Sequence, residues 1–126
     1  MLRTLLIVAL GGGVGSALRY AVSKFVQDNM SGAFPYHTFA VNIAGCLLIG
    51  LFYGLAARGH LGNNTTMLLL TTGLCGGFTT FSTFCNENIA LLRGDNAFVA
   101  LVYVASSVLC GLLAVMLGYL IIENIN

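Results

Sequence analysis

Residues 97–122 read AFVALVYVASSVLCGLLAVMLGYLII, and this segment indicates the class of fold most clearly. It contains no charged residue, and its polar side chains are confined to serine, tyrosine and cysteine. About 20 consecutive, mostly apolar residues are enough for a helix to cross the hydrocarbon core of a bilayer. The stretch therefore predicts a transmembrane helix.

Three further stretches satisfy the same criterion, and they lie at residues 2–22, 36–57 and 65–92. Short polar connections separate the four, with Pro35 at the start of one span and Gly94 after the end of another. We expect an all-α integral membrane protein that forms a single domain over residues 1–126, with both termini on one face of the membrane. It is expected as a multi-pass protein of a cell inner (plasma) membrane, of bacterial type.

The composition supports this interpretation, since 58% of the residues are hydrophobic and only 7% are charged. A soluble domain carries roughly 25% charged residues. The net charge of +1 and the absence of a basic block exclude a nucleic-acid partner. The four cysteines match neither a zinc pattern nor a Cys-x-x-Cys motif, and we interpret them as small apolar filler.

Lysine and arginine are balanced between the two faces. Arg3 and Arg58 flank the spans on the face of the termini, and Lys24 and Arg93 lie on the other, with Arg19 near a helix end. Because short-loop Lys and Arg counts set orientation, the balance predicts insertion in both orientations. One orientation set by some other signal is the alternative.

Two polar residues stand out in the second span, since polar groups inside a membrane usually face an interior or a cavity. Asn42 lies near its middle, and Thr38 lies one helical turn earlier on the same face. Asn42 either holds helices together or lines a pore.

The third span contains TTGLCGGFTTFSTF, residues 71–84, which is a poor continuous helix. Glycine and threonine both disfavour the helix interior, and we expect a break around residues 76–80. Unwound backbone in a membrane is tolerated only where it is buried or lines a cavity, and its carbonyls commonly coordinate cations. The alternatives are an ion site and a kink that only packs.

Aromatic and hydroxyl residues at helical spacing add weaker candidates. Phe81 and Phe84 share a helix face, and their positive ring edges would suit an anion, although packing is the more ordinary role. Tyr103 and Ser107 share a face of the fourth span. Pairs of glycines four residues apart, at positions 11 and 15 and at 50 and 54, predict close helix contacts.

Three motifs together resemble those of the CrcB/Fluc fluoride channels. They are GLCGGFTTFSTF at residues 73–84, TFAVNIAG at 38–45, and GGGVG at 11–15 continuing to Arg19 and Tyr20. The resemblance covers nearly the whole chain. It implies an antiparallel, dual-topology homodimer with two narrow pores that pass fluoride passively, lowering cytoplasmic fluoride and giving fluoride resistance.

The resemblance also implies roles for individual residues. A structural sodium ion would be held by the backbone carbonyls of Gly76 and Thr79. The pore would be formed by residues of the second, third and fourth spans, namely Asn42, Phe81, Phe84, Tyr103 and Ser107, with Ser82 and Thr83 beside the pore or the dimer axis.

Two positions depart from the family pattern. His37 stands where glycine is frequent, and we expect its ring to point to solvent, the alternative being an effect on the pore vestibule. Gly111 and Val115 stand where hydroxyl residues often continue the polar track of the fourth span, which predicts a shorter track.

Other functions are weighed against the fluoride channel. A small multidrug-type exporter of dual topology is the alternative, but it is built around an acidic residue in its first span, and residues 2–22 contain none. A non-transporting scaffold subunit is a third possibility. No carboxylate pair or His-centred constellation indicates an enzyme.

Overall fold

The computed structural model describes residues 1–60 and 62–125, and every regular element within them is helical. Four helical runs are long and apolar enough to cross a membrane: α1 (Leu2–Asn29), α2 (Tyr36–Ala57), the run Asn64–Arg93, and α6 (Ala97–Glu123). The third run is divided into α3 (Asn64–Leu68), the π-helix η1 (Leu69–Cys75), α4 (Gly76–Phe78) and α5 (Ser82–Arg93). The predicted class, an all-helical multi-pass membrane protein, is confirmed.

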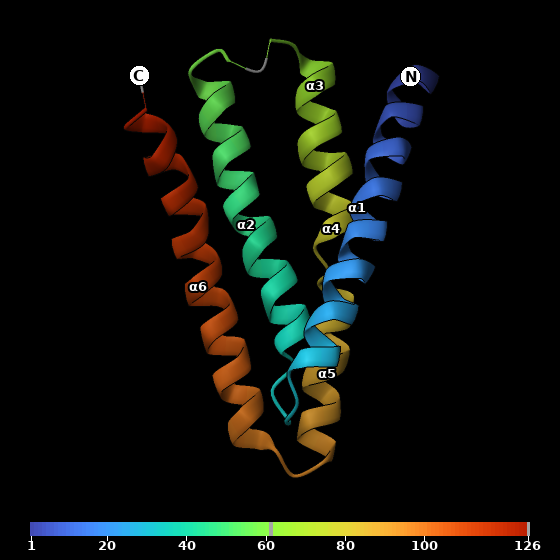
Figure 1. Cartoon of the computed structure of the whole chain (residues 1–126), viewed down its shortest axis with the longest axis vertical. Helices are drawn as coiled ribbons and strands as arrows, with labels where there is room; N and C mark the ends of the chain where they lie inside the picture. Colours follow the sequence, from blue (N-terminus) through green and yellow to red (C-terminus); the bar gives the residue numbers. More distant parts are fainter. Residues whose placement is uncertain (61, 126) are drawn as a thin grey trace.

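The four runs are connected as an up-and-down bundle, and both chain termini lie at the same end (Figure 1). The loops between α1 and α2 and between α5 and α6 lie at the opposite end. The most extensive packing joins α2 to α6, while α1 lies along η1 and α4. Most large apolar side chains outside these contacts are exposed, as a lipid-facing surface requires.

Glycines permit the closest helix contacts, as the four-residue spacings predict. A Cβ atom added to Gly15 would lie 2.9 Å from the backbone nitrogen of Phe78 and closer still to the carbonyl oxygen of Leu74. A Cβ atom on Gly50 would meet the carbonyl oxygen of Val115 on α6. The backbones of α1 and the third run, and those of α2 and α6, therefore pack without intervening side chains.

Helix α1 extends further than the sequence predicts. The expected end at residue 22 is wrong, because the helix continues through polar residues to Asn29. Lys24 and Asp28 form an ion pair of 3.4 Å one turn apart, and the Asn29 side chain donates to the carbonyl oxygen of Phe25. Local polar contacts thus continue the helix beyond its apolar part.

The third run breaks where glycine and threonine predict it. A π-helical turn ends at Cys75, α4 adds three residues, and Thr79 is extended with φ −90° and ψ 161°. The α-helix resumes at Ser82. The predicted interruption around residues 76–80 is confirmed, with the non-helical backbone at residues 79–81. Short π-helical segments are frequent at functional sites.

Candidate functional site

The side chain of Asn42 bridges the break in the third run. Its Nδ2 donates to the carbonyl oxygen of Thr80 at 3.0 Å, and the Thr80 N–H donates to Asn42 Oδ1 at 2.8 Å. The amide therefore satisfies both the N–H and the carbonyl group of Thr80, which have no helical partner where the backbone is unwound. Asn42 therefore joins α2 to the third run, and it also borders a groove.

At the break, two backbone carbonyls lack the hydrogen bonds that they would accept in a continuous helix. In a continuous helix the N–H groups of Thr80 and Thr83 would bond to the carbonyls of Gly76 and Thr79. Instead the Thr80 N–H bonds to Asn42, and the Thr83 N–H bonds to Thr80 Oγ1 at 3.3 Å. Among the described residues, neither carbonyl receives its helical hydrogen bond. The break thus presents oxygen acceptors of the type that hard cations prefer.

A groove of about 340 Å³ lies beside the break. It is mostly apolar and carries no charged side chain; its walls are Asn42, Gly45, Cys46, Ile49, Thr79, Thr80, Phe81, Phe84, Ser107, Val108 and Val115. Phe81 lies at the edge of this groove and is 76% exposed. The centroid of its ring lies 6.0 Å from the ring centroid of Phe84. Ser107 Oγ is buried and has no partner among the described residues.

A second polar cluster lies on the far side of Phe84 and is centred on Glu87. Its Oε1 accepts a hydrogen bond from the Tyr103 hydroxyl at 2.8 Å, and its Oε2 accepts one from Thr38 Oγ1 at 2.8 Å. The Tyr103 ring is completely buried and packs edge-on against Phe84, with centroids 4.9 Å apart. Phe84 therefore separates the groove from the carboxylate cluster.

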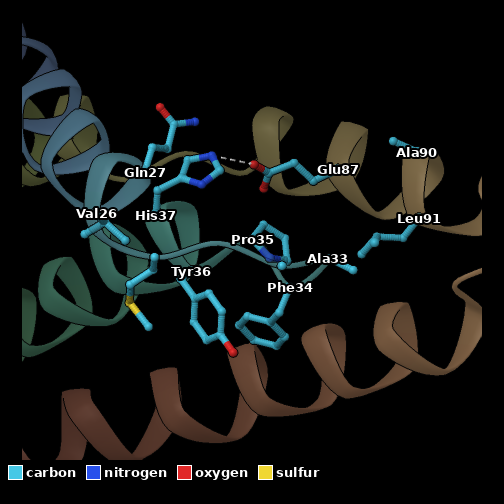
Figure 2. A pocket seen from close by; sticks show the side chains of 12 residues that line it. Val26, Gln27, Ala33, Phe34, Pro35, Tyr36, His37, Glu87, Ala90 and Leu91 are labelled. Carbon is cyan, nitrogen blue, oxygen red and sulfur yellow. Dashed lines mark ion pairs between the residues drawn. The ribbon is translucent and has the colours of Figure 1, made fainter.

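Two further hollows flank this cluster. One, of about 390 Å³, lies under the loop between α1 and α2, and Figure 2 shows His37 and Glu87 pointing toward each other across its rim. The other, of about 200 Å³, is lined by Arg19, His37, Thr38 and Thr83 among others. The Nε of Arg19 is buried there without a partner among the described residues.

The structure brings most predicted site residues together, but not all. Asn42, Phe81, Phe84 and Ser107 line one groove. Thr83 lines the hollow of Arg19. Ser82 is exposed and borders none of these three cavities, and Tyr103 lies behind Phe84 rather than in the groove.

One expectation from sequence needs correction. His37 does not simply point to solvent, since its Nε2 lies 3.0 Å from Glu87 Oε2 and its side chain is only 24% exposed. Thr38 lies one turn from Asn42 on the same helix, and it bonds to Glu87 whereas Asn42 bonds to Thr80. Sequence reasoning missed Glu87, although an acidic residue inside an apolar span is itself a signal.

Known proteins resemble the chain over almost its full length. A family model described as CrcB-like protein, Camphor Resistance (CrcB), matches residues 6–119. A protein of Flavobacterium psychrophilum named Fluoride-specific ion channel FluC is 44% identical over 124 residues, which cover 98% of this chain and all of the relative. A protein of the same name from Phocaeicola vulgatus is 50% identical over 117 residues, or 93% of this chain and 96% of the relative.

Proposed function

The chain belongs to the CrcB-like family, and from this premise we propose that it is a passive, fluoride-selective ion channel that lowers cytoplasmic fluoride. The observation that carries the proposal is the break held open by Asn42, with Phe81 and Phe84 beside it in an uncharged groove. Hydrogen fluoride enters cells as a neutral acid and ionises inside. A passive anion leak is therefore sufficient for export, and no catalytic chemistry is required.

The groove chemistry suits a small, strongly hydrated anion. Asn42 has a second amide hydrogen beyond the one given to Thr80. Ser107 Oγ has no partner among the described residues, and the two phenyl rings offer positive edges. Several weak donors replace water without trapping the ion, as conduction requires. A lysine or arginine in the groove would bind fluoride too tightly, and its walls have neither.

An antiparallel homodimer is part of the proposal. The groove is open along one side of a single subunit, and Phe81 stands 76% exposed at its edge. A second copy of the chain would enclose this path. The balance of Arg3 and Arg58 against Lys24 and Arg93 supports subunits inserted in both directions. Cysteine crosslinking from an exposed site near Phe81 should give a covalent dimer in membranes.

A structural sodium ion fits the residues present. The carbonyls of Gly76 and Thr79 lack their helical donors, and unwound carbonyls coordinate Na⁺ in other membrane proteins. Hard cations take about six oxygen ligands, so two carbonyls from each of two subunits would come closer to a full set. We expect higher thermal stability of the purified protein in sodium than in choline salts.

The positions of the other predicted site residues suggest their roles in the channel. Thr83 would act at the vestibule with Arg19, and Ser82, which faces outward, would lie at the subunit interface. Tyr103 and Ser107 would form the polar track on either side of Phe84. The multidrug-type alternative has no comparable support, because α1 contains no acidic residue before Asp28 and the relatives are named fluoride channels.

The test is ion efflux from liposomes that contain the purified protein, measured with ion-selective electrodes. We expect rapid fluoride release and no chloride release above that of protein-free vesicles. Equal release of the two anions, or none from a monodisperse preparation, would overturn the proposal.

A further inference from the structure

The imidazole ring of His37 lies in close contact with the carboxyl group of Glu87. Its Nε2 lies 3.0 Å from Glu87 Oε2, and the two side chains are 24% and 16% exposed. We propose that His37 is a positioning residue that acts through Glu87: its protonation compensates the carboxylate beside the ion path and makes conduction rise as the pH falls. This inference rests on the proposed fluoride channel.

The carboxylate is held in a fixed place near the path. Two hydroxyl donors converge on it, from Tyr103 and Thr38, and His37 Nε2 lies 3.0 Å from its Oε2, an arrangement that suits an ionised carboxylate because that group only accepts. The Tyr103 ring contacts Phe84, a wall of the groove. The carboxyl group of Glu87 therefore lies one aromatic layer behind the proposed route of an anion.

His37 lies where an entering anion would pass. Its side chain lines both the hollow of about 390 Å³ under the α1–α2 loop and the hollow of about 200 Å³ that contains Arg19. Figure 2 shows the ring between the end of α1 and the Glu87 side chain on α5. The imidazole thus borders the space between the loop face of the membrane and the break.

The charge state of the ring changes the electrostatics of this region. With neutral imidazole the pair carries one negative charge, which repels fluoride at short range in a weakly screened environment. With imidazolium the pair is neutral. Both ring nitrogens then carry a proton, and no described residue accepts from Nδ1, which leaves a donor for an anion.

The other ionisable groups around His37 do not account for a change in conduction between about pH 5 and 8. Arg19 and Tyr20 face it from α1, and Tyr36 adjoins it on α2. Tyr103 on α6 reaches the same carboxylate. Arginine and tyrosine side chains ordinarily keep their charge state between pH 5 and 8, whereas histidine changes its own there. The exposed Lys24–Asp28 pair is satisfied within α1.

The experiment measures fluoride efflux from proteoliposomes at matched internal and external pH, from about 5.5 to 7.5. Protein-free vesicles at each pH correct for permeation of neutral hydrogen fluoride. The variants are His37→Gln, which keeps a donor but cannot ionise, and His60→Gln. The latter is the matched control, because His60 is the other histidine of the chain and lies exposed in the loop after α2.

We expect wild type and His60→Gln to conduct about three- to tenfold faster at the acid end, and His37→Gln to show no pH dependence. A flat wild-type profile, or the same slope in His37→Gln, would overturn the inference while leaving a fluoride channel intact. Absence of fluoride flux at every pH would instead overturn the proposed function.

A second measurement does not depend on flux. In ¹⁵N-histidine-labelled protein, the ring signals lost in His37→Gln should change position in Glu87→Gln, because the carboxyl group lies 3.0 Å from the ring nitrogen. Ring signals that stay unchanged in Glu87→Gln would show that the two side chains are not in contact and would refute the mechanism.

Discussion

Replacement of Asn42 by leucine is the most informative perturbation of the break. It removes both hydrogen bonds to Thr80 and leaves a backbone N–H and a carbonyl without partners inside the membrane. Polar contacts between membrane helices contribute on average about 0.6 kcal/mol each and at most about 1.7 kcal/mol. Two such bonds predict a loss of about 1–3 kcal/mol in the free energy of unfolding.

Asn88→Leu provides the matched control on the third run. Asn88 is buried, but its Nδ2 donates only to the carbonyl of Phe84 one turn earlier, and its Oδ1 has no partner among the described residues. Removing an unsatisfied buried acceptor is close to neutral or stabilising. We therefore expect Asn88→Leu to change the unfolding free energy much less than Asn42→Leu.

Reversible unfolding in mixed micelles measures both variants, and fluoride efflux from liposomes measures whether the break still conducts. We expect Asn42→Leu to lose stability and flux together. If the unfolding free energy of Asn42→Leu lies within about 0.5 kcal/mol of the wild-type value and the variant conducts fluoride normally, Asn42 does not stabilise the break.

Three further predictions follow from individual contacts. Phe81→Ile should reduce fluoride flux while the dimer remains intact by size-exclusion chromatography, because the exposed ring supplies edges that isoleucine lacks; normal flux would mean that the ring only packs. Gly15→Ala should destabilise the protein by about 1–3 kcal/mol, since its Cβ would meet the backbone of Leu74 and Phe78, whereas Gly13→Ala, with open space around it, should not; equal thermal stability of the two variants would contradict the close packing of α1. Tyr103→Phe should cost about 1–2 kcal/mol of unfolding free energy, because it removes one donor to Glu87 but keeps the ring against Phe84; an unchanged unfolding curve would argue against the carboxylate cluster.

The membrane class, the four spans and the break were predictable because each rests on local composition. A charge-free run such as residues 97–122 has only one stable environment, and the glycines and threonines of residues 71–84 disfavour a helix wherever they lie. The length of α1 was not predictable from apolar content, because its last turns are stabilised by the Lys24–Asp28 pair and by Asn29.

The partners of the polar groups were less accessible from sequence. The spacing places Thr38 and Asn42 on one helix face, yet they contact different elements, Glu87 on α5 and Thr80 at the break. The pairing of His37 with Glu87 joins residues 50 positions apart and depends on the tertiary arrangement that brings the start of α2 near α5. Glu87 itself is a charged residue in an apolar span, which marks it as a candidate before any partner is known.

The reversal potential of the purified protein in a planar bilayer under a fluoride gradient shows whether the current is carried by fluoride alone. A passive, selective fluoride channel predicts a current that reverses near the full Nernst potential of fluoride and does not move when a chloride gradient is imposed. A reversal potential that follows the chloride or the proton gradient instead would contradict the account.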